Sequence, residues 1–234
     1  MNVDRKMKFP KGLIVSCQAY EGDPMFGSHN MANMAKAAEL GGAVAIRANS
    51  PQDIRTIRQI TKLPIIGLYK VYSSASDVYI TPDFDSAESI ALAGSNILAI
   101  DSTCRVRPKN IKLSDLFKFI QDSLHKPIMA DISCVEDAIV AESLGADMVS
   151  TTLSGYTSQG GSAMEGPDIN LVEELVKTVQ IPVVAEGRYH HPHQVARAIL
   201  LGAHAVVVGE AITRPEKITE RYAKAINCLS NDEK

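Results

Sequence analysis

Short apolar runs alternate with segments of helical spacing along the whole chain. Four of the runs follow a glycine that closes a helical segment, and these glycines recur at intervals of 53, 51 and 57 residues, at Gly41, Gly94, Gly145 and Gly202. The other four follow a proline, at Pro10, Pro64, Pro127 and Pro182. Glycine is favoured just after a helix, and proline is tolerated at the first residue of a strand. The two interleaved series predict eight strands, at 12–18, 42–47, 64–70, 96–101, 127–131, 146–152, 182–186 and 204–209.

The segments between these runs predict helices. Ile54, Ile57 and Ile60 share one helical face, Ser50-Pro51 matches an N-cap with proline at the first helical position, and Ser114 matches a plain N-cap. Strands that are apolar throughout are typical of parallel strands covered by helices. Eight strand–helix units predict one closed (β/α)8 barrel, the TIM barrel. A doubly wound open sheet stays the alternative, because alternation alone does not establish closure.

Composition and charge narrow the class of protein. The 234 residues are expected to form a single domain (1–234), with 1–10 as an N-terminal extension and 230–234 frayed. Twenty-four basic and 27 acidic residues give a net charge of −3, which argues against a nucleic-acid partner. No apolar run approaches the roughly 18 residues of a membrane span, and the first twelve residues do not resemble a signal peptide. Four widely spaced cysteines indicate free thiols in a reducing compartment, hence a cytoplasmic location.

Polar residues stand where the predicted strands end. Because the active sites of such barrels lie at the carboxyl ends of the strands, these residues are candidates for chemistry. Charges that emerge directly from buried strands converge on one opening and need partners there. The simpler interpretation is that polar residues only mark where buried strands stop. The candidates are Gln18, Arg47, Lys70, Asp101, Asp131, Thr151-Thr152, Glu186 and Gly209-Glu210.

Lys70 ends the third predicted strand and has two catalytic uses. It can form a Schiff base with a carbonyl compound, or it can remove a proton as a general base; both need the neutral amine. A structural ion pair with a carboxylate is the alternative. Tyr69, Tyr72 and Tyr79 surround or follow this lysine, and they either cover the site or pack a loop.

Glycines follow the last two predicted strands. Gly187-Arg188 and Gly209-Glu210 stand where this type of barrel usually binds phosphate, with backbone N–H groups that glycine lets an anion approach. We therefore predict a phosphate site, with two tight turns as the simpler alternative. The negative charge of the Glu210 carboxylate would repel a phosphate unless the side chain points away from the site.

Three histidines form the remaining cluster. His190, His191 and His193 precede a helix predicted over 194–201, and no matching set of ligands stands elsewhere in the chain. A solvent-facing loop with a helical first turn is favoured over a metal site.

Six blocks of the sequence carry a resemblance to a known family. They are Gly12–Ala19, Gly41–Asn49, Met129–Ile132, Ser150–Thr157, Val184–Arg188 and Ala211–Pro215. Together, over about residues 11 to 225, they resemble the N-acetylmannosamine-6-phosphate 2-epimerase family. The resemblance implies a TIM barrel that interconverts N-acetylmannosamine 6-phosphate and N-acetylglucosamine 6-phosphate in sialic-acid or amino-sugar catabolism, with no metal and no redox cofactor.

The resemblance also implies roles for individual residues. The catalytic residues fall on Lys70 and Glu186; the substrate-binding residues fall on Gln18, Arg47, Asp131 and Thr152; the phosphate-binding residues fall on Gly187, Arg188, Gly209 and Glu210. Two positions depart from the family pattern. Val71-Tyr72 stand where a basic residue and an aspartate often follow the lysine, and Glu210 stands where a small residue is expected.

The implied mechanism is proton transfer at carbon 2 of the open-chain sugar. Lys70 removes the proton, Arg47 or another donor stabilises the enolate, and Glu186 either orients Lys70 or supplies the second proton. One mobile base and two separate bases both stay open. A Schiff-base sugar-phosphate aldolase and a non-catalytic sugar-phosphate-binding barrel are the alternative functions. For the assembly of the protein, a homodimer is the expectation.

Overall fold

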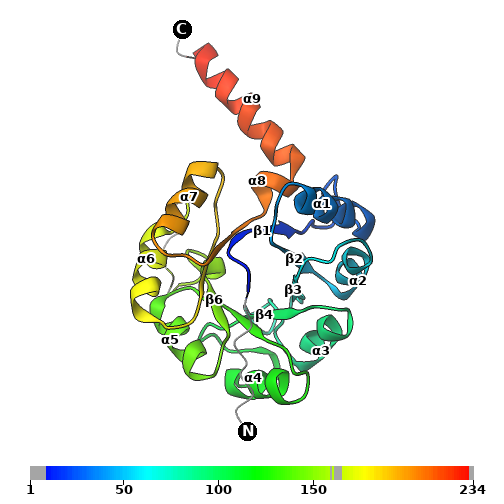
Figure 1. Cartoon of the computed structure of the whole chain (residues 1–234), viewed down its shortest axis with the longest axis vertical. Coiled ribbons are helices and arrows are strands. Elements are labelled where there is room, and N and C mark those ends of the chain that lie inside the picture. Colours follow the sequence, from blue (N-terminus) through cyan, green and yellow to red (C-terminus); the bar gives the residue numbers. More distant parts are fainter. Residues whose placement is uncertain (1–8, 159, 161–164, 232–234) are drawn as a thin grey trace.

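Eight parallel strands close into a barrel in the order of the sequence (Figure 1). The computed structural model describes residues 9–158, 160 and 165–231. Each strand pairs with the next, and β1 also pairs with β8, where Val15 lies opposite Val208. The predicted (β/α)8 barrel is therefore confirmed. The strands are β1 Gly12–Cys17, β2 Ala45–Asn49, β3 Ile65–Leu68, β4 Ile97–Asp101, β5 Ile128–Asp131, β6 Met148–Ser150, β7 Val183–Glu186 and β8 Ala205–Val208.

Helices surround the barrel (Figure 1). None of them is, over the residues described, both long enough and apolar enough to cross a membrane. Two short 3-10 turns, η1 Pro108–Asn110 and η2 Thr151–Leu153, lie in the loops after β4 and β6. The helices are α1 Ser28–Leu40, α2 Pro51–Ile60, α3 Phe84–Leu92, α4 Leu113–Asp122, α5 Val135–Ser143, α6 Ile169–Thr178, α7 Pro192–Leu200, α8 Glu210–Thr213 and α9 Pro215–Asn231.

The observed starts of three helices can be compared with the predicted ones. The Ser50 side chain accepts a hydrogen bond from the Asp53 N–H, which confirms the predicted cap of α2. The prediction for Ser114 is wrong, because the N-cap position of α4 is occupied by Lys112, two residues earlier. The Lys112 backbone carbonyl accepts the N–H groups of Asp115 and Leu116 in the first turn. Helix α7 begins at Pro192, two residues before the predicted start. The Gln194 side chain accepts the N–H of His191 and thereby closes this first turn.

Alternate residues of the strands face opposite sides of the barrel wall. Inward residues such as Ile14, Ile66, Met129 and Val184 form a core inside the barrel. Residues between them pack against the helices in separate clusters. Phe9 belongs to the inner core and is 6% exposed. The predicted extension over 1–10 thus contributes to packing at its inner end, and residues 1–8 lie outside the described part of the chain.

The predicted bounds of two strands are wrong in a way that matters for the site. Strand β2 continues to Asn49, which pairs with Leu68, so Arg47 lies inside the strand rather than at its end. Strand β6 stops at Ser150 because Thr151 begins η2, and the Thr151 hydroxyl instead bonds both the N–H and the carbonyl of Glu186. At the other end of the chain, α9 continues through Asn231, and residues 232–234 lie outside the described part. The fraying expected over 230–234 stays a prediction.

Candidate active site

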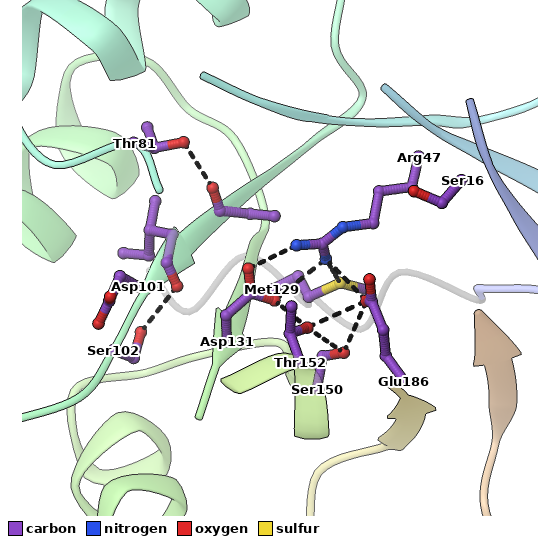
Figure 2. Close-up of polar contacts among 12 residues, drawn as sticks. Ser16, Arg47, Thr81, Asp101, Ser102, Met129, Asp131, Ser150, Thr152 and Glu186 are labelled. Carbon is purple, nitrogen blue, oxygen red and sulfur yellow. Dashed lines mark hydrogen bonds and ion pairs between the residues drawn. The ribbon is translucent and has the colours of Figure 1, made fainter. Parts of the chain in front are cut away.

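The carboxyl ends of β1, β7 and β8 and the residues after β3 border a cavity of about 240 Å³. Most of the predicted site residues line it, namely Gln18, Lys70, Glu186, Gly187, Arg188, Gly209 and Glu210. The other three, Arg47, Asp131 and Thr152, do not line it and lie behind Glu186, where they form a polar network (Figure 2). Their direct contact with a substrate stays a prediction.

Arg47 is the centre of this network. Its guanidinium donates two hydrogen bonds to the Asp131 carboxylate, with Nη2 at 2.5 Å from Oδ2 and Nη1 at 3.0 Å from Oδ1. The same Nη1 lies 3.2 Å from Glu186 Oε2. The Arg47 side chain is only 1% exposed and that of Asp131 is not exposed. Burial lowers the pKa of Arg47, but the charges of Asp131 and Glu186 outweigh burial and raise it, so the guanidinium stays charged.

Two hydroxyl groups complete the network around Glu186. Thr152 Oγ1 lies 2.8 Å from Asp131 Oδ1 and 3.0 Å from Glu186 Oε2, and Ser150 Oγ lies 3.2 Å from the same Glu186 oxygen. Glu186 Oε2 thus faces a charged nitrogen and two hydroxyls, and its side chain remains 14% exposed toward the cavity. These contacts fix the direction in which the carboxylate points.

Burial raises the pKa of the Asp131 carboxyl to about 6, and Glu186 adds to this rise, whereas the adjacent Arg47 opposes it. At neutral pH the carboxylate is therefore still ionised and paired with Arg47. The Asp131 carboxyl therefore takes up its proton in mildly acidic solution, whereas an ordinary aspartate, with a pKa of about 3.9, does so only at lower pH.

Lowering the pH will stabilise the wild type relative to an Asp131→Asn variant. A carboxyl with a pKa of about 6 in the folded protein binds its proton more tightly there than in the unfolded chain. This contribution to stability is fully present below about pH 4 and is lost as the pH rises through about 6. Between about pH 7.5 and pH 5, the difference in free energy of unfolding should change in favour of the wild type by on the order of 1 kcal/mol, measured by urea unfolding. A difference that is constant with pH would contradict the raised pKa.

Lys70 is held at the edge of the cavity by an aromatic residue. Its Nζ lies 2.7 Å from the Tyr20 hydroxyl and 4.7 Å from the centre of the Tyr20 ring. Its backbone N–H donates to Asn49 Oδ1, and a bridge to Ile80 continues the chain as a hairpin. The amine is thus directed into the opening of the barrel and is not in an ion pair with a carboxylate among the described residues.

The predicted phosphate residues surround the opposite part of the same cavity. Arg188 has a positive φ of 59°, and its side chain donates to the carbonyl groups of Ser154 and Gly166, both at 2.8 Å. Gly209 precedes the short helix α8, and a Cβ there would approach Ser16 Cβ to 3.3 Å. The close packing explains why glycine suits this position. A phosphate at these residues stays a prediction.

Asp101 takes no part in this cavity, although it ends β4. Its carboxylate accepts hydrogen bonds from the N–H and hydroxyl of Thr103 and from Arg105 Nη2, which lies 2.6 Å away. Figure 2 shows it apart from the network around Arg47. Asp101 therefore holds the loop between β4 and α4, and the simpler interpretation of a polar strand end applies to it.

The three histidines are spread over a helix start. His191 and His193 are exposed and stack at 5.4 Å between ring centres, and His190 Nδ1 lies 2.7 Å from Arg221 Nη1 on α9. Within the described ranges, no three His, Cys, Asp or Glu side chains gather as metal ligands.

Tyr20 and Arg214 are among the cavity-lining residues that were not predicted as site residues. Tyr20 contacts Lys70, and the Arg214 guanidinium lies 5.4 Å from the Tyr20 ring and pairs with Asp23 at 2.6 Å. Tyr20 stands two residues after Gln18, and Arg214 directly follows α8. Their nearness to the ends of β1 and β8 was the only available signal.

Comparison with known proteins identifies the family of this chain. A family profile described as "Putative N-acetylmannosamine-6-phosphate epimerase" matches residues 31–228. Two relatives are each named "Putative N-acetylmannosamine-6-phosphate 2-epimerase". The one from Caldanaerobacter subterraneus subsp. tengcongensis is 46% identical over 227 residues, covering 97% of this chain and 95% of the relative. The one from Clostridioides difficile is 48% identical over 214 residues, covering 92% and 95%.

The structural comparison gives the same family. The solved N-acetylmannosamine-6-phosphate 2-epimerase from Clostridium perfringens matches with a TM-score of 0.90 and 45% identity, covering 93% of this chain and 94% of that chain. A thiamine phosphate pyrophosphorylase from Pyrococcus furiosus, at 16% identity and a TM-score of 0.59, shares the fold alone. The chain therefore belongs to the N-acetylmannosamine-6-phosphate epimerase family.

Proposed function

We propose that this protein is a 2-epimerase that interconverts N-acetylmannosamine 6-phosphate and N-acetylglucosamine 6-phosphate. The observation that carries the proposal is that Lys70, just after β3, and Glu186, at the end of β7, line one cavity. In a closed barrel of eight strands, β3 and β7 lie on opposite sides of the opening. Inversion at carbon 2 needs a proton removed from one face and a proton delivered to the other, and this placement suits both steps.

The chemistry begins with the open-chain sugar, because only a carbonyl at carbon 1 makes the proton on carbon 2 acidic. One of the two groups accepts that proton, and the electron pair of the broken C–H bond moves into an enolate. A proton from the other group then reaches carbon 2 on the opposite face. Lys70 and Glu186 exchange these roles when the reaction runs in reverse.

Arg47 acts in this proposal without lining the cavity. Together with Thr152 and Ser150 it fixes the Glu186 carboxylate, and Asp131 in turn fixes Arg47. Its buried positive charge also lowers the energy of a nearby enolate, because charges interact more strongly away from water. Arg47, Asp131 and Thr152 are thus positioning residues, and Gln18 on the cavity wall is the predicted direct contact.

The phosphate is assigned to the β7 and β8 side. The backbone N–H groups near Gly187 and Gly209 support this placement. Arg214 lies on the same wall, where Asp23 and Glu216 pair with its guanidinium. The Arg188 guanidinium is already bound to two carbonyl groups, so we assign its role to orienting the loop. The Glu210 backbone, rather than its carboxylate, faces the anion in this proposal.

Proton NMR of N-acetylmannosamine 6-phosphate in D2O tests the function. The protein should form N-acetylglucosamine 6-phosphate that carries deuterium at carbon 2 and an intact carbon chain. Cleavage of the chain, with sugar trapped on Lys70 by borohydride, would favour the Schiff-base aldolase. Binding without turnover would favour the non-catalytic barrel.

We also propose that the protein is cytoplasmic and forms a homodimer. The widely spaced cysteines support the location. Helix α9 projects away from the barrel (Figure 1) and exposes Ile226 at 66%, which supports contact with a second copy. Sedimentation of the full chain at micromolar concentration tests the assembly.

A further inference from the structure

His190 lines the active-site cavity but has no part in the chemistry described above. It lies in the loop after β7 and borders the same 240 Å³ cavity as Gly209 and Arg214. It therefore stands on the β7 and β8 side, to which the phosphate is assigned. The other two histidines of the cluster, His191 and His193, do not line this cavity.

The backbone of His190 is fixed at the start of α7. Its N–H donates to Gln194 Oε1 at 2.8 Å, and the same oxygen accepts the N–H of His191 at 3.0 Å. The preceding residue, Tyr189, is 4% exposed and packs with Ala185 and Val208 in the core outside β7 and β8. The His190 ring is thus held at the cavity wall without a ligand.

Arg221, on α9, determines which nitrogen of the His190 ring carries the proton. Arg221 Nη1 lies 2.7 Å from His190 Nδ1. Because a guanidinium is always charged and only donates, Nδ1 accepts this hydrogen bond. In a neutral ring, the single proton therefore lies on Nε2.

The surroundings keep this ring neutral at neutral pH. Burial lowers the pKa of His190 below the ordinary histidine value of about 6.5, and the charge of Arg221 lowers it further. His191 and Arg188 act in the same direction, whereas the Glu210 carboxylate opposes them. The ring therefore has one acceptor, directed at Arg221, and one donor.

The donor, Nε2, is left without a partner. No hydrogen bond or ion pair joins it to any residue that the structure places. The two nitrogens of an imidazole ring point in divergent directions, so Nε2 faces away from Arg221.

The two arginines on the same wall are already engaged. Arg214 pairs with Asp23 at 2.6 Å and with Glu216 at 3.1 Å. The Arg188 guanidinium donates to two backbone carbonyl groups. A phosphate on this side of the cavity would therefore gain from His190 a donor that no other described group uses.

We propose that His190 is a phosphate-binding residue that donates a hydrogen bond from Nε2 to a phosphate oxygen of the substrate, and that Arg221 positions its ring. The identity of the substrate rests on the 2-epimerase function. Binding of an anion at His190 does not, and inorganic phosphate serves as the probe for it.

The first test is a His190→Phe variant, which keeps a ring and loses the donor. A hydrogen bond to a charged group contributes enough that KM for N-acetylmannosamine 6-phosphate should rise roughly 10–100-fold. We expect little change in kcat, because the phosphate lies away from the reacting carbon. His190→Gln, whose amide N–H replaces that of Nε2, should recover most of the affinity.

The matched control is His193→Phe, which removes an exposed neighbouring ring outside the cavity. It should leave both KM and kcat unchanged. A fall in kcat with an unchanged KM in His190→Phe would overturn the proposal, and so would an equal rise of KM in His190→Phe and His190→Gln.

The second test follows the His190 ring of the wild type by nitrogen-15 NMR at about pH 7.5. We expect a proton on Nε2 and none on Nδ1, and inorganic phosphate should shift the Nε2 signal until the site is saturated. The His193 ring is the internal control. An Nε2 signal that phosphate does not move would contradict the proposal. A phosphate-dependent shift in a protein without epimerase activity would instead overturn only the 2-epimerase function.

The third test concerns the positioning role of Arg221. In Arg221→Leu, Nδ1 has no donor to face, so KM should rise by less than in His190→Phe. The double variant should show no further rise beyond that of His190→Phe, because Arg221 acts through the His190 ring. Additive losses would show that Arg221 acts independently of His190.

Discussion

Replacing Lys70 with alanine will abolish the interconversion of the two sugar phosphates. General acid–base groups contribute about 10²–10⁴-fold to rates, and Lys70 is the only lysine that lines the 240 Å³ cavity in the described part of the chain. A Lys70→Arg variant should be equally inactive, because arginine keeps the positive charge near Tyr20 but does not lose its proton in the working pH range. The measurement is the rate of product formation by NMR in D2O.

The matched control for this prediction is Lys177→Ala. Lys177 is exposed on α6, and its ion pair with Glu173 spans one helical turn at the surface, so its loss should leave the rate unchanged. If Lys70→Ala still formed product at a rate comparable to the control, another group would be the base. If Lys70 and Glu186 act as two separate bases, Glu186 should still exchange the carbon 2 proton of one epimer with solvent in Lys70→Ala, although no inversion follows.

Replacing Arg47 with methionine will both unfold the protein more easily and remove activity. The substitution leaves the Asp131 carboxylate buried without its two hydrogen bonds from the guanidinium. Removing one partner of a buried ion pair typically lowers the free energy of unfolding by about 3–5 kcal/mol. Urea unfolding of the variant should show a loss of this size, and turnover should fall because Glu186 loses its contact with Arg47.

A double variant, Arg47→Met with Asp131→Leu, separates stability from function. Both charges are then gone, and an apolar pair of similar volume fills the space. Such replacements are often neutral or stabilising, so most of the lost stability should return. The rate should not return, because Glu186 then keeps only the Ser150 and Thr152 hydroxyls. Recovery of the rate together with the stability would show that the ion pair has no positioning role.

Much of the barrel could be predicted because its signals are local. A proline at a strand start and a glycine after a helix act within a few residues, and so does the Ser50 side chain that caps α2. The ends of β2 and β6 could not be placed in the same way. Asn49 remains in the sheet because it pairs with Leu68, and Thr151 leaves it because its hydroxyl bonds the Glu186 backbone. The end of each of these two strands thus depends on its contacts with a neighbouring strand.

The sequence by itself determined the eight strands, their parallel order and the set of polar residues that the strands carry toward one opening. Only the tertiary structure decided which of these residues face the cavity, which are buried behind it, and which, like Asp101, organise a loop. The physical reason is that a side chain's role depends on partners distant in sequence. Arg47 pairs with Asp131, 84 residues away, and Lys70 meets Tyr20 across 50 residues. No local pattern encodes such distances, because barrel closure brings these groups together.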